Sequence, residues 1–140
     1  IDFGVRHKGY CSDISRTIYI GNPVKREKEM YNHLLKIQEA AISKVKNNKK
    51  CSELYGFVAE SLGKNKKFFT HGLGHGLGIE IHEMPNLALN SKDRIKNNMV
   101  FTIEPGIYFP GKFGIRIEDT VLFRGKPIIL TKTPKDLLIV

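Results

Sequence analysis

The sequence predicts an α+β domain in which an antiparallel sheet carries two helices. Apolar residues recur at helical spacing in two stretches, 25–46 and 52–62. Residues 1–20 and 100–118 instead resemble antiparallel hairpins, because strand-forming residues flank short turns. At 140 residues, the chain can bury about 68–70% of its unfolded surface. We therefore expect one hydrophobic core.

Residues 1–20 are expected to form two strands joined by a tip at His7-Lys8. In that register, Asp2 faces Asp13. Directly opposed residues have Cβ atoms about 4.5–5.5 Å apart, and like charges in such a pair are destabilising. A divalent cation between the two carboxylates would remove that repulsion.

Two helices should follow this hairpin, because Asn22-Pro23 ends the strand pattern. The first is predicted from Lys25 to about Lys46. Its core-facing stripe comprises Tyr31, Leu34, Leu35, Gln38, Ala41, Ile42 and Val45. The second is predicted from an N-cap at Ser52 to Leu62, before Gly63. Its inward residues are Leu54, Phe57, Val58 and Leu62. Neither helix is expected to carry catalytic residues.

The segment HGLGHGLGIEIHE, from His71 to Glu83, contains three histidines within twelve residues. They are His71, His75 and His82. A lone histidine is more often structural, but this cluster favours one metal ligand and two groups for hydrogen bonding or proton transfer. The glycines of the segment, Gly72, Gly74, Gly76 and Gly78, predict an irregular backbone.

A second acidic hairpin follows. A turn around residues 110–112 places Glu104 opposite Glu118, with Arg116 on the same face as Glu118. Apolar residues surround these acids, which indicates burial, and unpaired acids are rarely buried. The two hairpins therefore point to the same requirement for positive charge between paired carboxylates.

These residue types suit a site for two divalent ions. Carboxylates bind hard cations, and one imidazole is compatible with manganese, iron, cobalt or zinc. Two ions about 3.5–4 Å apart can activate a water molecule and stabilise negative charge on a carbonyl oxygen. The pattern thus indicates amide hydrolysis without a covalent intermediate.

Charge and composition argue against a nucleic-acid-binding, a membrane-spanning or a disulfide-rich protein. The net charge of +9 comes from lysines mixed with Asn and Glu, without the aromatic-interleaved stripe typical of nucleic-acid binding, so no nucleic-acid partner is expected. No apolar run is long enough to cross a membrane. The only cysteines, Cys11 and Cys51, indicate no disulfide framework, which favours the cytoplasm.

The motifs HGLGHGLGIEIHEMP, FTIEPGIY and GIRIEDTV resemble the pita-bread metallopeptidases, in the branch of Xaa-Pro dipeptidases (prolidases) and Xaa-Pro aminopeptidases. The resemblance covers nearly the whole chain. It implies a curved antiparallel sheet with two long helices on its outer face. It also implies two divalent metal ions, with manganese, cobalt and zinc all compatible.

The resemblance assigns each candidate residue a role. Asp2 would bind one ion, Asp13 and Glu118 would bridge both, and His75 and Glu104 would complete the other. Glu104 would also act as general base or proton shuttle. His82 would contact the scissile carbonyl, His71 would lie on the substrate side, and Arg116 would support the ligands.

The resemblance further implies that residues 1–140 are the C-terminal portion of a catalytic domain, with an N-terminal domain and the first part of the catalytic domain absent. The expected substrate is a peptide with proline at the second position, and the full-length protein is expected to be a homodimer. The fragment alone is expected to turn over slowly or not at all.

Four alternatives differ in substrate or in class. A Xaa-Pro aminopeptidase acting on longer peptides and a methionine aminopeptidase would use the same ligands. A non-catalytic pita-bread binding domain is disfavoured because all five ligand residues are present. A metal-free amidinohydrolase like creatinase would not require two facing carboxylate pairs.

Overall fold

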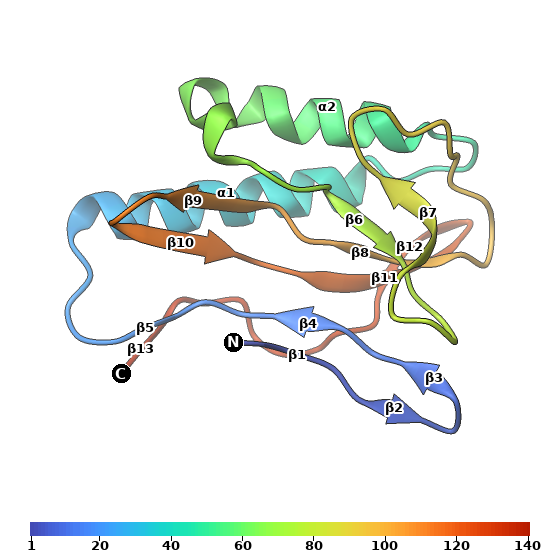
Figure 1. Ribbon diagram of the computed structural model, residues 1–140, viewed down its shortest axis with the longest axis horizontal. Coiled ribbons are helices and arrows are strands. Elements are labelled where there is room, and N and C mark those ends of the chain that lie inside the picture. The colour runs from blue at the N-terminus through green and yellow to red at the C-terminus, as the bar shows by residue number, and fades with distance from the viewer.

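The computed structural model describes residues 1–140 and confirms the α+β class. A five-stranded antiparallel sheet has the order β12-β11-β8-β6-β7. Its strands are β6 (Gly74–Gly76), β7 (Glu83–Leu87), β8 (Val100–Ile103), β11 (Asp119–Arg124) and β12 (Lys126–Ile129). Helices α1 (Lys25–Ser43) and α2 (Cys51–Ser61) lie together on one side of this sheet (Figure 1).

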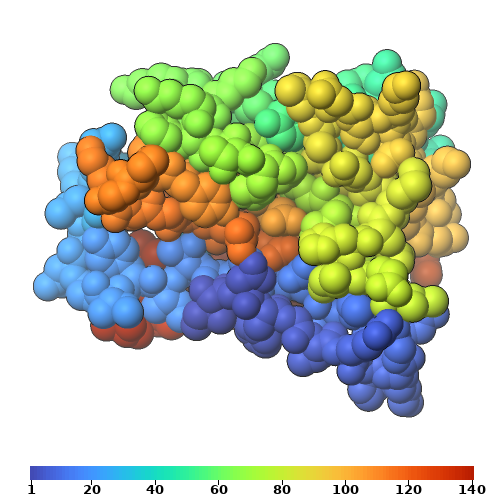
Figure 2. Space-filling view, viewed as in Figure 1, coloured from blue at the N-terminus to red at the C-terminus, as the bar shows by residue number.

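Short strands form the rest of the chain. The N-terminal ribbon contains β1 (Asp2–Phe3), β2 (Arg6–His7), β3 (Tyr10–Cys11), β4 (Ile14–Ser15) and β5 (Ile18–Tyr19). A second hairpin comprises β9 (Gly106–Phe109) and β10 (Phe113–Arg116), and β13 (Leu138–Ile139) pairs in parallel with β5. A 3₁₀ helix, η1 (Gly63–Phe68), follows α2. In Figure 1 the ribbon lies on the side of the sheet away from the helices, and in Figure 2 its dark-blue atoms lie against the orange and yellow-green atoms.

The hydrophobic core lies between the helices and the sheet. Most of the predicted helical stripe is buried, including Leu34 and Val45, but Ile37 is buried where Leu35 is only partly covered. Of the inward residues predicted for α2, Phe57 is the one that is only partly buried. The helices meet strand residues such as Phe101, so one apolar cluster holds both layers together.

Three predicted helix boundaries were wrong, including the end of α2, which is Ser61 with Leu62 as the C-cap. Helix α1 ends at Ser43, and Lys44 is its C-cap residue. Helix α2 begins at Cys51 with Lys50 at the N-cap, so Ser52 lies inside the first turn. The Lys50 position is set by tertiary contact, since Lys50 forms an isolated bridge with Arg94. Local capping preference is weaker than that contact.

The prediction of irregular backbone in the histidine segment was confirmed in part, because residues 77–82 form no regular element and the β6–β7 register shifts between His75 and Gly76. Gly74 and Gly76 lie within β6, and none of the four glycines has a positive φ angle. They are needed because other backbone comes close. A Cβ atom on Gly74 would lie 2.7 Å from the carbonyl carbon of Thr102 in β8. Glycine therefore allows β6, which carries His75, to sit tightly between its neighbours.

No helix of the structure has the length and apolar character required to cross a membrane. Both cysteines are free, with Cys51 buried and Cys11 partly exposed.

Candidate metal centre

All eight predicted site residues line one cavity of about 560 Å³ between the N-terminal ribbon and the sheet. They are Asp2, Asp13, His71, His75, His82, Glu104, Arg116 and Glu118. Four further residues complete the lining: Gly72, Gly74, Asn86 and Tyr108. The fold thus brings together side chains that are spread over more than a hundred positions of the sequence.

The first hairpin has a different register from the prediction. The tip is Lys8-Gly9, both with positive φ angles, and Asp2 pairs with Ser15 rather than with Asp13. Positive φ at both central residues is typical of a type I′ turn, whose twist matches that of the strands. Because the register differs by two residues, Asp2 and Asp13 still project from the same face, as diagonal neighbours.

The second hairpin has the predicted register. Arg116 pairs with Gly106 in one ladder, and Asp119 pairs with Ile103 in the next. Both pairs belong to one continuous register. Glu104 and Glu118 lie between these two pairs in the sequence, so the same register places them opposite each other. Glu118 is 2% exposed, which places its carboxylate in the floor of the cavity.

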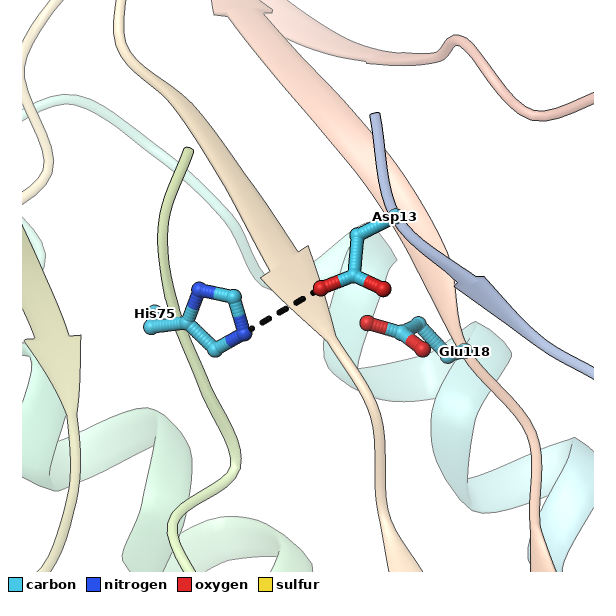
Figure 3. A group of neighbouring side chains, drawn as sticks. All are labelled: Asp13, His75 and Glu118. Carbon is cyan, nitrogen blue, oxygen red and sulfur yellow. Dashed lines mark ion pairs between the residues drawn. The ribbon is translucent and has the colours of Figure 1, made fainter. Parts of the chain in front are cut away.

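His75 brings an imidazole to these carboxylates from β6. Its Nε2 atom lies 3.3 Å from Oε1 of Glu104 and 3.5 Å from Oδ2 of Asp13. Its Nδ1 atom lies 3.0 Å from the carbonyl oxygen of Gly76, which fixes the ring and leaves Nε2 directed at the acids. One ligand atom each from Asp13, His75 and Glu118 lies within 4.8 Å of the others (Figure 3).

The carboxylates are crowded with like charge. Burial, together with the nearby charges of Glu104, Asp13 and Asp2, raises the pKa of Glu118 to about 7. Burial also raises the pKa of Asp13, and the Asp2 and Glu104 charges add to that rise. Such clustering is unfavourable for folding unless positive charge compensates it.

His75 and Glu104 shift each other's pKa, upward for His75 and downward for Glu104. Burial favours the neutral form of His75, yet hydrogen bonding to Glu104 and to Gly76 raises its pKa overall. Burial likewise favours protonated Glu104, but hydrogen bonds from His75 and Thr102 lower its pKa below the ordinary value. The Thr102 hydroxyl donates to Glu104 Oε1 at 2.9 Å and accepts from the His75 backbone N–H at 3.0 Å. Glu104 is therefore held as a carboxylate.

The donor set fits divalent metal ions. The five predicted ligands, four carboxylates and the His75 imidazole, line a single cavity to which no cysteine contributes. Hard or borderline ions such as manganese, cobalt and zinc accept this combination of oxygen and nitrogen ligands. Bound cations would also neutralise the repulsion that raises the pKa of Glu118 and Asp13.

Sequence reasoning missed Tyr108, which connects two of the predicted residues. Its hydroxyl lies 3.0 Å from His71 Nε2 and accepts a hydrogen bond of 2.9 Å from Arg116. A Cβ atom on Gly106 would lie 2.5 Å from the Tyr108 hydroxyl and 2.6 Å from His71 Nε2, so glycine leaves room for this contact. Alternation in β9 could have identified Tyr108, because its neighbours Ile107 and Phe109 are buried on the other face.

His82 and Asn86 also line the cavity. The His82 ring is exposed and meets the His75 ring edge-on, with centroids 4.2 Å apart. Asn86 lies directly across from His75 in the β6–β7 ladder. Both side chains are therefore available to a ligand that enters the cavity beside the carboxylates.

Comparisons with known proteins agree with this geometry. The chain is 41% identical to the Xaa-Pro dipeptidase of Pyrococcus furiosus over 141 aligned residues, which is 99% of this chain and 40% of that protein. Among solved structures, Xaa-Pro dipeptidase from Bacillus anthracis matches with a TM-score of 0.95 at 40% identity, over 99% of this chain and 40% of that one. X-Pro aminopeptidase from Thermotoga maritima matches with a TM-score of 0.93 at 39% identity, with the same coverage.

The chain thus spans about 40% of the length of these relatives, and it has the pita-bread architecture of the prolidases that it matches. The model of metallopeptidase family M24 matches residues 1–124, which include every residue of the cavity lining. The chain belongs to metallopeptidase family M24.

Proposed function

We propose that this chain is the C-terminal portion of the catalytic domain of a two-metal peptidase that hydrolyses the bond between an N-terminal residue and proline. The observation that carries the proposal is the convergence of Asp2, Asp13, His75, Glu104 and Glu118 on one cavity. Relatives named as Xaa-Pro dipeptidases, about 40% identical, support the substrate class.

The five acidic and imidazole residues would hold two divalent ions, such as manganese, cobalt or zinc. When bound, such ions supply Lewis acidity and an activated water nucleophile at neutral pH. Asp13 and Glu118 both line the cavity, with a carboxylate oxygen of each within 4.8 Å of the other, which would suit carboxylates shared by two ions. Asp2 would serve one ion alone, and His75 and Glu104 would serve the other.

Glu104 is placed to accept the proton of the attacking water. It is held as a carboxylate by the Thr102 hydroxyl and by His75, and a positioned base of this kind contributes about 10²–10⁴-fold in rate. His82 is exposed at the cavity and can donate to the oxygen of the scissile carbonyl as negative charge develops there. Glu104 would thus accept and return the proton, while His82 binds the carbonyl group of the peptide.

His71 would lie on the substrate side, and Arg116 would support the metal ligands. Both contact the Tyr108 hydroxyl, so neither ring nor guanidinium is free to rotate away. Arg116 also pairs with Asp2, which orients that carboxylate toward the cavity. A Xaa-Pro bond is a tertiary amide without an N–H, so recognition would depend on shape and on the terminal amine rather than on an amide donor.

The test uses the full-length protein, stripped of metal by chelation and reloaded with Mn²⁺ or Co²⁺. We expect metal-dependent hydrolysis of a Xaa-Pro dipeptide, with a dipeptide lacking proline cleaved much more slowly. Glu104→Gln should lower kcat by about 10²-fold or more. Glu29→Gln, at an exposed position of α1, is the matched control and should leave the rate unchanged.

The second candidate is a Xaa-Pro aminopeptidase acting on longer peptides, favoured by the similar match to the Thermotoga maritima enzyme. A Xaa-Pro-Xaa tripeptide in the same assay separates the two. Faster cleavage of the tripeptide would favour the aminopeptidase. Absence of metal-dependent cleavage of either peptide would contradict both.

A further inference from the structure

Ser15 connects the two acidic hairpins through its side chain. It lies in β4, is 3% exposed, and donates a 2.7 Å hydrogen bond to Oε2 of Glu118. Its Oγ atom also lies 3.1 Å from Nε of Arg116. One hydroxyl group therefore touches a candidate metal ligand and the arginine that holds another, Asp2.

The direction of these hydrogen bonds follows from chemistry. A guanidinium can only donate, so Arg116 Nε–H occupies a lone pair of the Ser15 oxygen. The single hydroxyl hydrogen of Ser15 is then left for the Glu118 carboxylate. Arg116 in turn donates its remaining nitrogens to Tyr108 and Asp2. The chain of donors fixes one oxygen of Glu118 relative to Asp2.

We propose that Ser15 is a positioning residue that fixes the Glu118 carboxylate for two divalent ions; this rests on the proposed function. Without the hydroxyl, Glu118 Oε2 would lose its side-chain donor, and Arg116 Nε would lose its acceptor. Both losses act on side chains that would bind metal, directly or through Asp2. Groups that orient metal ligands in this way typically contribute 10–100-fold in metal affinity.

Thr17 provides a matched control two residues farther along the ribbon. Its hydroxyl donates to the carbonyl oxygen of Arg116 at 2.9 Å and accepts from the Arg116 N–H at 3.1 Å. These bonds join the same two segments through the backbone and reach no carboxylate. Removing the Thr17 hydroxyl therefore tests the contribution of segment joining alone, whereas removing that of Ser15 also releases Glu118.

The experiment titrates Mn²⁺ into metal-free full-length protein by calorimetry and records the absorption spectrum of the Co²⁺-loaded protein. For Ser15→Ala we expect about 10–100-fold weaker binding of the shared ions and an altered Co²⁺ spectrum. Ser15→Thr should restore both, because it keeps the hydroxyl. Thr17→Val should keep the affinity and spectrum of the wild type. Far-UV circular dichroism shows whether each variant is folded.

Wild-type affinity and an unchanged spectrum in folded Ser15→Ala would overturn the positioning role. Equal losses in Ser15→Ala and Thr17→Val would also overturn it, because segment joining alone would then explain the effect. These outcomes are distinct from failure of the proposed function. A wild type that binds two ions but cleaves no Xaa-Pro peptide would overturn the function alone, and a wild type that binds no Mn²⁺ would overturn both.

Discussion

Replacing Gly74 with alanine should destabilise the protein, whereas the same replacement at Gly56 should stabilise it. Gly74 lies in β6, where an added Cβ atom would be 2.7 Å from the carbonyl carbon of Thr102 and 2.9 Å from its Oγ1 atom, and closer still to its carbonyl oxygen. Gly56 lies in α2, where the added atom would meet nothing within 4 Å. The same added methyl group is therefore crowded at Gly74 and has free space at Gly56.

The magnitudes follow from these contacts. Ordinary carbon contacts are about 3.5–4.0 Å, so β6 and β8 would have to separate by about 1 Å at Gly74. Overpacking of this kind costs about 1–3 kcal/mol. Alanine in a helix interior is about 0.5–1 kcal/mol better than glycine, which sets the gain at Gly56. The two variants should thus differ by about 1.5–4 kcal/mol in the free energy of unfolding.

The strand separation should also reach the metal centre. Thr102 accepts from the His75 N–H and donates to Glu104, so a shift at Gly74 would displace both candidate ligands. We expect Gly74→Ala to bind Mn²⁺ more weakly and Gly56→Ala to bind it as the wild type does.

Urea denaturation of the metal-free full-length protein, followed by far-UV circular dichroism, measures the stability difference. Calorimetric titration with Mn²⁺ measures the binding difference. Shifts of the same sign in the two variants, or a Gly74→Ala protein as stable as the wild type, would refute the close-approach argument.

Three further predictions concern Asp119 and the cysteines. Asp119→Asn should cost about 3–5 kcal/mol in urea denaturation, because the partly buried cations Arg16 and Lys135 lose their buried carboxylate partner, whereas exposed Glu29→Gln should change stability by less than about 0.5 kcal/mol. Burial raises the pKa of Asp119, but its hydrogen bonds outweigh burial and lower the pKa overall. Its stabilisation should therefore be present above the unfolded pKa of about 4, and the gap in stability between wild type and Asp119→Asn should close as the pH falls through the lowered folded-state value. Burial raises the pKa of Cys51 to about 12, so iodoacetamide at pH 8 should label Cys11 and spare Cys51 in the native protein; peptide mass spectrometry showing Cys51 labelled as fast as in urea would contradict this.

The strand face from which each acid projects could be predicted more reliably than the residue that it pairs with on the opposite strand. The predicted tip of the first hairpin was one residue early, which changed the pairing of Asp2 from Asp13 to Ser15. The side chains of a strand alternate with a period of two, so this shift of two in register kept both acids on the same face. An error of one residue in register would have moved one acid away from the cavity.

Hydrogen bonds and salt bridges between segments far apart in the sequence could not be predicted. Ser15 and Glu118 are 103 positions apart, and Tyr108 contacts His71 across 37 positions. Nothing in the local sequence near Ser15 indicates which carboxylate its hydroxyl will meet. Asp119 adjoins a predicted ligand, yet its salt bridge to Arg16 depends on how the ribbon packs against β11.

The sequence by itself determined the elements, the helix stripes and the chemical types gathered at the site, because periodicity and residue type are local properties. It also carried the motifs that mark the family. Tertiary structure alone decided the register of Asp2, the close approach that requires Gly74, and the Ser15 contact with Glu118. Each depends on the relative positions of segments far apart in the chain, which packing of the whole domain sets and local preference does not.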